Sequence, residues 1–153
     1  MADVVVTITI SAVSYKTWLN TSLVGLSTVV GGVPMIELTE MGPDQEDAFA
    51  NYNDEACREV LKIFVSRQGD AAGTPFEKTS TEVIYRFAEE QPPLPHAASI
   101  KVTLYEDVKN AIYTFITYMW FKIKNNEEMS KFLDARYHKL TDNIENALFK
   151  LHD

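Results

Sequence analysis

Two segments with apolar residues at helical spacing dominate the sequence: LYEDVKNAIYTFITYMWFKI at residues 104–123 and EEMSKFLDARYHKLTDNIENALFKL at residues 127–151. The apolar face of the first carries Leu104, Val108, Ala111, Ile112, Phe115, Ile116, Met119 and Ile123. The face of the second carries Met129, Phe132, Leu133, Tyr137, Leu140, Ile144, Ala147, Leu148 and Leu151. Steps of three and four align residues on one side of an α-helix. Since the link between the segments is short, we expect an antiparallel helical hairpin over residues 98–153.

The residues at the ends of these segments support the hairpin. Thr103 and Glu106 match a capping box at the start of the first helix, and a start a few residues earlier is the alternative. Asn125 and Glu128 suit the start of the second helix. The interruption at Asn125-Asn126 is therefore expected to be the turn.

Two further segments have the alternation of β-strands. They are VVVTITI at residues 4–10 and TEVIYRFA at residues 81–88. The expected inward residues are Val4, Val6, Ile8 and Ile10 in one strand, and Val83, Tyr85 and Phe87 in the other. Because two strands alone make a marginal sheet, we expect them to lie against helices or to pair with another chain.

Helical spacing also marks two segments in the first half of the chain. In residues 12–29 the expected inward positions are Val13, Leu19, Leu23 and Leu26, together with Trp18 or the stem of Lys16. A second helix is expected after the N-cap Asp44, ending near Gly69, with its inward stripe at Phe49, Tyr52, Ala56, Val60, Leu61 and Phe64. Residues 31–43 are predicted to be a loop with a short extended piece at 35–38, and residues 70–80 are rich in turn formers.

These elements predict an α+β fold that is mainly α, a helical bundle with a small β element. A chain of 153 residues fits a single domain. Its parts are an N-terminal strand and helix (1–30), an acidic loop and helix (31–69), a β element with a proline-rich connector (70–97) and the helical hairpin (98–153).

The charge is concentrated in one segment. The formal net charge is −8, and residues 37–59 carry eight acids against one base, Arg58. This composition argues against a basic nucleic-acid footprint and against attraction to anionic lipid. The candidate acidic surface consists of Glu40, Asp44, Glu46, Asp47, Asp54 and Glu55. The alternatives are a docking surface for a basic partner, a surface that lets DNA slide past, and an ordinary solvated helix face.

Signals for secretion or membrane insertion are not expected. Asp3 stands where a signal peptide needs positive charge. Residues 17–36 carry no charge, but they contain many polar residues, and Gly31-Gly32 and Pro34 would interrupt a membrane helix.

The sequence contains no catalytic or metal-binding motif. Cys57 is the one cysteine, and it is expected to be a buried structural thiol. The histidines at 96, 138 and 152 lie far from it in sequence, and no phosphate-binding glycine pattern occurs. We therefore expect no catalytic residue, no cofactor and no metal, and a protein that is not an enzyme. A catalytic centre built from atypical motifs is the alternative.

Aromatic residues crowd residues 113–121. Tyr113, Phe115, Tyr118, Trp120 and Phe121 cannot all share one helix face at 100° per residue. Either neighbouring helices cover several faces within the chain, or some of these residues anchor an oligomer interface. The candidate interface residues are Trp18, Tyr113, Tyr118, Trp120 and Phe121.

The order of elements resembles a family of phage proteins. It runs from a strand and a helix to a second helix with NDEACREVL (residues 53–61), then a strand near 81–88. An aromatic-rich helix follows, joined at Lys124-Asn125-Asn126-Glu127 to an amphipathic terminal helix. This order resembles small head–tail connector or ring proteins of tailed phages of Bacteroides-type bacteria, including crAss-like phages. The resemblance covers roughly residues 43–150 and carries no catalytic or binding residues.

The resemblance implies a structural virion protein. Such a subunit would form a homo-oligomeric ring, typically of twelve copies, that joins the portal protein to other connector or tail proteins around the DNA channel. DNA would pass nearby without sequence-specific binding, and no membrane would be involved. The alternative from the residues is a small soluble bacterial adaptor or regulatory protein that binds a basic partner through its acidic helix.

Overall fold

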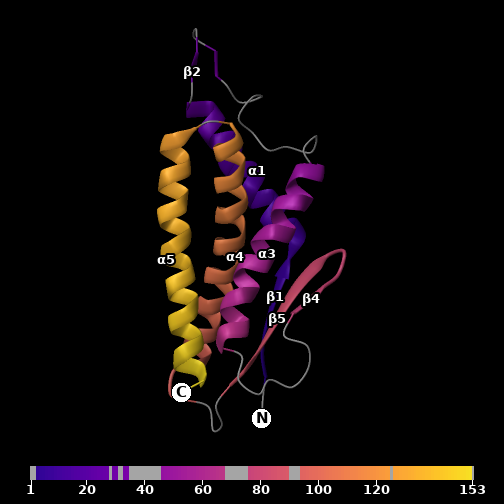
Figure 1. Ribbon diagram of the computed structural model, residues 1–153, viewed down its shortest axis with the longest axis vertical. Helices are drawn as coiled ribbons and strands as arrows, with labels where there is room; N and C mark the ends of the chain where they lie inside the picture. Colours follow the sequence, from indigo (N-terminus) through magenta and orange to yellow (C-terminus); the bar gives the residue numbers. More distant parts are fainter. Residues whose placement is uncertain are drawn as a thin grey trace.

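The computed structural model describes residues 3–27, 29–30, 33–34, 46–67, 76–89, 94–124 and 126–152. In chain order the elements are β1 (Asp3–Thr9), α1 (Ile10–Ser27), β2 (Val29–Val30), β3 (Val33–Pro34), α3 (Glu46–Arg67), β4 (Phe76–Lys78), β5 (Glu82–Ala88), α4 (Ala97–Ile123) and α5 (Glu127–His152). Helices α4 and α5 lie side by side along the longest axis (Figure 1). The predicted fold class, α+β and mainly α, is confirmed.

The helical hairpin formed by α4 and α5 is the framework of the molecule. The predicted stripes are buried at Leu104, Val108, Ala111, Ile112 and Ile116 in α4, and at Leu133, Ile144, Ala147, Leu148 and Leu151 in α5. Asn126 caps α5, because its Oδ1 accepts the backbone N–H of Met129 at 3.2 Å. Asn125, the predicted cap, lies outside the described residues.

Three details of the predicted hairpin are wrong. Helix α4 begins at Ala97, so Thr103 is not a cap, and its hydroxyl instead donates to the carbonyl of Ser99 at 3.1 Å inside the helix. Ile123 is 56% exposed, because it lies in the last turn of α4. Phe132 is 60% exposed. Neighbouring residues of a helix point in different directions, so the orientation that buries Leu133 turns Phe132 outward.

A three-stranded antiparallel sheet, in the order β1-β5-β4, packs beside the helices. Val6 lies opposite Tyr85, and the predicted alternation is confirmed, with inward side chains at Val4, Val6, Ile8, Val83, Tyr85 and Phe87. Ile10, predicted to continue the strand, begins α1 and is partly buried. Strand β4 lies within residues 70–80, where the sequence predicts turns. It was missed because three residues are too few to show the alternation of a strand. The hydroxyl of Thr79 in the β4–β5 turn accepts the N–H of Glu82 at 3.0 Å.

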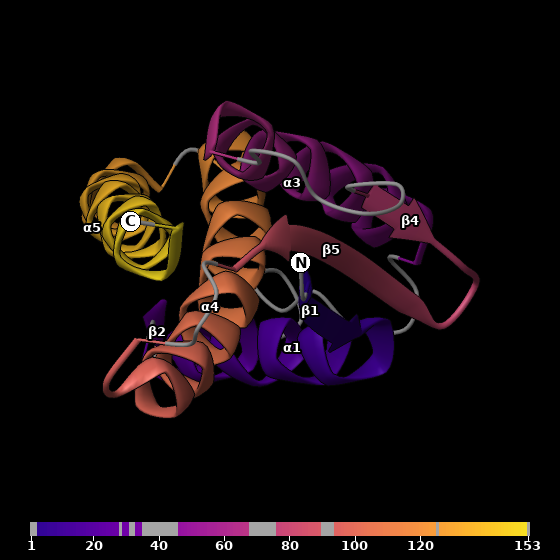
Figure 2. The same cartoon turned by 90° about the horizontal axis from the view of Figure 1, so that it is seen from below.

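Helices α3 and α1 flank the sheet. Figure 2 shows them on opposite sides of strands β5 and β1, with α4 passing beside both helices. Helix α3 buries Ala56, Val60 and Phe64, and the Phe64 ring stacks on Tyr85 with centroids 4.9 Å apart. Phe49, Tyr52 and Leu61 are only partly buried.

The ends of the predicted helices fit less well. Helix α1 covers residues 10–27 rather than 12–29, because Val29–Val30 pairs with Val33–Pro34 in a small hairpin. The expected cap Asp44, the extended piece at 35–38 and the helix stop near Gly69 lie outside the described residues.

Candidate interaction surface

One side of α1 exposes aromatic surface on a helix that is almost free of charge. Lys16 is the one charged residue among its 18. Tyr15 is 62% exposed and Trp18 is 37% exposed, and their ring centroids lie 6.0 Å apart. Together with the exposed Ser11 and Ala12 they form one side of the helix, here called the α1 face. Depletion of charge with enrichment of Tyr and Trp is the composition of protein interface cores.

The alternative for α1 in which Lys16, not Trp18, turns inward is confirmed. The Lys16 ammonium donates to Asn110 Oδ1 at 2.8 Å and lies 4.8 Å from the centroid of the Tyr113 ring, both on α4. Trp18 therefore keeps exposed surface, as a candidate interface residue requires. Tyr15 was missed by the sequence reasoning, although its position three residues before Trp18 on a charge-poor helix could have indicated it.

Most of the other aromatic candidates are enclosed within the chain. Tyr113 is 3% exposed, Trp120 4% and Phe121 1%, so these three are core residues and not surface anchors of this chain. The reason is that α1, α3, α5 and β1 all contact α4 and cover it on several sides. Tyr118 is partly exposed and lies near Lys122, whose ammonium is 5.7 Å from the centroid of its ring.

Cations from two helices lie near the ring of Tyr113. Besides Lys16 of α1, the Arg136 guanidinium of α5 lies 5.7 Å from the centroid of the Tyr113 ring. Burial lowers the pKa of Lys16, and the charges of Lys109 and Arg136 lower it further, while Glu106 acts in the opposite direction. Lys109 and Glu106 are themselves an ion pair on α4, at 3.3 Å. We call Lys16, Lys109 and Arg136 the basic cluster; it was missed because its members are distant in sequence.

The candidate acidic surface is only partly described. Glu40 and Asp44 lie outside the described residues, and Glu46 is the first residue of α3. Asp47 and Glu55 are exposed on α3. Asp54 forms an ion pair with Lys78 of β4, so this carboxylate is engaged within the chain.

Strand β1 adds a second kind of surface. It occupies an edge of the sheet, and no strand among the described residues pairs with its outer side. Val5 is 52% exposed, and residues 4–9 contain neither charge nor proline. Natural proteins commonly protect edge strands with charged residues or proline. Residues 4–9 have neither, so this edge is suited to pair with another strand.

The Cys57 thiol has the character of a core group. It is 1% exposed, and burial raises its pKa to about 11. Its Sγ lies 3.9 Å from Asn53 Oδ1, and the hydroxyl of Tyr85 donates to the Cys57 carbonyl at 3.0 Å. At neutral pH this sulfur is a protonated thiol, which is a poor nucleophile. The prediction that Cys57 is buried is confirmed.

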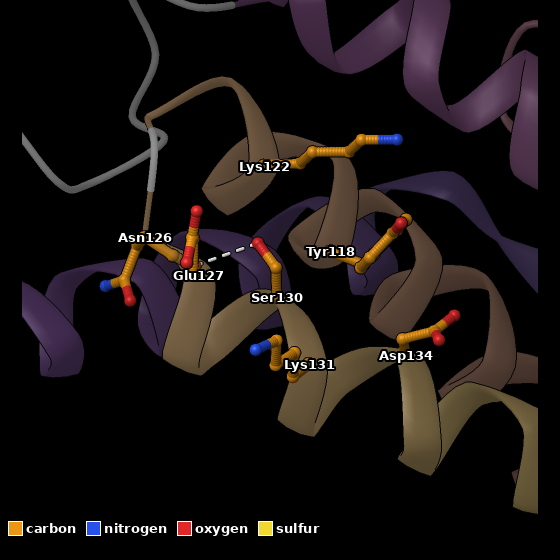
Figure 3. Close-up of a pocket in the computed structure, with 7 residues that line it drawn as sticks. All are labelled: Tyr118, Lys122, Asn126, Glu127, Ser130, Lys131 and Asp134. Atoms are coloured by element: carbon orange, nitrogen blue, oxygen red, sulfur yellow. Dashed lines mark hydrogen bonds between the residues drawn. The ribbon is translucent and has the colours of Figure 1, made fainter.

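A groove lies at the turn between α4 and α5 (Figure 3). Tyr118 and Lys122 line it from α4, and its other lining residues are Asn126, Glu127, Ser130, Lys131 and Asp134. The hydroxyl of Ser130 donates to the carbonyl of Asn126 at 2.9 Å. Two lysines and two carboxylates line the groove, so it favours neither anions nor cations.

The described residues contain neither a metal-binding group nor a membrane-spanning helix. These residues bring no three His, Cys, Asp or Glu side chains into a group that could hold a metal ion. No helix within the described ranges combines the length and the apolar character needed to cross a bilayer. Comparisons with protein-family models, with curated proteins and with solved structures found no match.

Proposed function

We propose that this protein is a non-enzymatic structural subunit that acts by assembling with copies of itself. Following the family resemblance, the assembly is a ring in the head–tail connector or tail of a tailed phage. The ring joins the portal protein to tail components around the DNA channel, and the protein is localised in the virion. The observation that carries the proposal is the α1 face, where Tyr15 and Trp18 are exposed on a helix with one charge.

The edge strand β1 supports self-assembly independently of α1. A second copy that supplies a strand to this edge would satisfy its backbone groups and cover Val5. A ring subunit needs two different surfaces that meet after a fixed rotation. The α1 face and the edge of β1 are each available for a contact with another copy.

The overall charge of the chain fits a position near DNA. The formal net charge is −8, and negative charge repels phosphates instead of holding them. A DNA channel that must not grip its contents is served by this charge. No cofactor is required for such a role.

Sedimentation velocity and negative-stain microscopy of the purified protein test this proposal. We expect a discrete oligomer that grows in population with concentration, and ring-shaped particles on the grids. A protein that stays monomeric over two orders of magnitude of concentration would contradict it. Labelling of purified virions with an antibody against the protein tests the location, for which we expect signal at the head–tail junction or tail.

The second candidate is a monomeric adaptor that binds a basic protein through α3. The exposed carboxylates of Asp47 and Glu55 favour it. A basic partner retained in a pull-down, together with a monomeric mass and no rings, would support the adaptor and reject the ring.

A further inference from the structure

The basic cluster and the exposed acids of α3 lie in different parts of the molecule. Helix α3 lies on one side of strands β5 and β1, and α1 lies on the other (Figure 2). The basic cluster has members on α1, α4 and α5, two of which lie near Tyr113 of α4, and the exposed acids Asp47 and Glu55 lie in the first half of α3. A chain with a net charge of −8 thus contains a local concentration of positive charge in this part of the fold.

The basic side joins charge to exposed aromatic surface. Lys16 and Arg136 both lie within 6 Å of the Tyr113 ring centroid, at 4.8 and 5.7 Å. Lys16 immediately follows Tyr15 in α1, so the basic cluster borders the α1 face. Glu106 offsets one of the three cations. Like charges this close oppose one another, so an incoming carboxylate would be stabilised.

Helix α3 exposes acidic side chains in its first half. Asp47 and Glu55 are exposed there, whereas Arg58 and Lys62 follow them further along the helix. Lys62 is held by Glu59 at 2.8 Å. Among the acids of α3, the exposed pair Asp47 and Glu55 therefore lies in the first half of the helix.

We infer that the first half of α3 of one copy docks on the surface formed by the basic cluster and the α1 face of the next copy. The occupant is a second copy because its exposed Asp47 and Glu55 carry charge opposite to that of the basic cluster. The Arg136 guanidinium can receive a carboxylate in a two-bond geometry, and Tyr15 and Trp18 supply the apolar contact beside it. This inference rests on the proposed self-assembly and adds which surfaces meet.

The placement of the two surfaces determines the symmetry. A contact between different surfaces on opposite sides of a subunit is heterologous and repeats from copy to copy. Such a contact gives a ring if the rotation closes, and a filament if it does not. A two-fold dimer would instead bring the same surface of both copies together.

Two charge-reversed variants test the contact. Asp47→Lys/Glu55→Lys reverses the acidic side, and Lys109→Glu/Arg136→Glu reverses the basic side. We expect each variant alone to associate at least about tenfold more weakly than the unaltered protein, because like charges then meet. An equimolar mixture of the two variants should recover association, since every contact then pairs opposite charges. Raised salt should weaken association of the unaltered protein.

Matched variants control for net charge and folding. Lys122→Glu/Lys131→Glu and Glu128→Lys/Asp142→Lys make the same charge changes at exposed positions of the hairpin, and should associate as the unaltered protein does. If circular dichroism shows that Lys109→Glu/Arg136→Glu is unfolded, Lys109→Gln/Arg136→Gln takes its place and should also lose association.

The outcomes separate this inference from the proposed function. Should the unaltered protein assemble and both reversed variants assemble equally well, the inference is wrong and self-assembly stands. Loss without recovery in the mixture also overturns it, because the two sides then do not meet each other. Should the unaltered protein remain monomeric, self-assembly and this contact are both rejected.

Discussion

Truncation of Phe121 and of Tyr15 should separate core residues from interface residues. Phe121 is 1% exposed, and removal of a fully buried phenyl group costs about 3–5 kcal/mol. For a chain of this size each kcal/mol moves the thermal midpoint by about 2–4 °C, so Phe121→Ala should lower the midpoint by about 6–20 °C. Tyr15 is 62% exposed, so Tyr15→Ala should cost below about 1 kcal/mol.

The two variants should behave in the opposite order in assembly. Tyr15→Ala removes an aromatic anchor of the α1 face and should weaken self-association by about tenfold. Phe121→Ala, while it is folded, keeps that face. Unfolding is followed by circular dichroism at the lowest usable concentration, where assembly contributes least to stability. Association is followed by sedimentation velocity.

Two results would refute this reasoning. In the first, Tyr15→Ala lowers the thermal midpoint as much as Phe121→Ala does, which would make the α1 face part of the monomer's core. In the second, Phe121→Ala abolishes association without lowering the midpoint, which would return Phe121 to the interface.

Three further predictions concern the monomer. Burial raises the pKa of Cys57 from 9.0 to about 11, so between these pH values the folded state keeps a proton that the unfolded chain loses. The free energy of unfolding, measured by urea titration, should therefore fall as pH rises from 9 to 11. An equally steep fall in Cys57→Ala would reject this cause. Asn126→Ala removes the cap at the N–H of Met129 and should cost about 1 kcal/mol in urea unfolding, while Asn126→Asp should cost much less; equal losses would argue against the cap. The Lys101 ammonium lies 2.7 Å from Oε2 of Glu89, which is 3% exposed, so Lys101→Met should lower the free energy of unfolding by about 3 kcal/mol. The double variant with Glu89→Gln should recover part of this loss. An unchanged unfolding midpoint in Lys101→Met would mean that the pair contributes nothing to stability.

The hairpin and the central strand were predictable because their signals are local. Steps of three and four along residues 104–151 and the alternation at Val83, Tyr85 and Phe87 each require only neighbouring residues. The strand β4 and the small hairpin of β2 and β3 are too short for any periodicity. These strands form because they pair with another segment, and the periodicity of apolar residues carries no information about pairing.

The covered sides of α4 were harder to predict. The spacing of apolar residues predicts a single buried stripe on this helix. Residues 111–121 carry no charge at all, however, which is typical of a helix buried on all sides. Thr117 follows this pattern, since it is 2% exposed and its hydroxyl donates to the Tyr113 carbonyl at 2.7 Å. The absence of charge in residues 111–121, given more weight than the single stripe, would have assigned Tyr113, Trp120 and Phe121 to the core.

The basic cluster could not be predicted from the sequence. Lys16 and Arg136 are 120 positions apart, and only the fold brings both to the ring of Tyr113. The acidic segment was visible as a block of charge, but the ion pair between Asp54 and Lys78 depends on the packing of α3 beside β4. Composition therefore indicated how much charge there is, and only the structure indicated which of it is available to a partner.

The most direct test of the central claim, that this chain is a self-assembling subunit, is the native mass of the purified protein. We expect one discrete species whose mass is a whole multiple of 17.3 kDa, in equilibrium with the single chain at low concentration. A mass of 17.3 kDa at every concentration would contradict the claim.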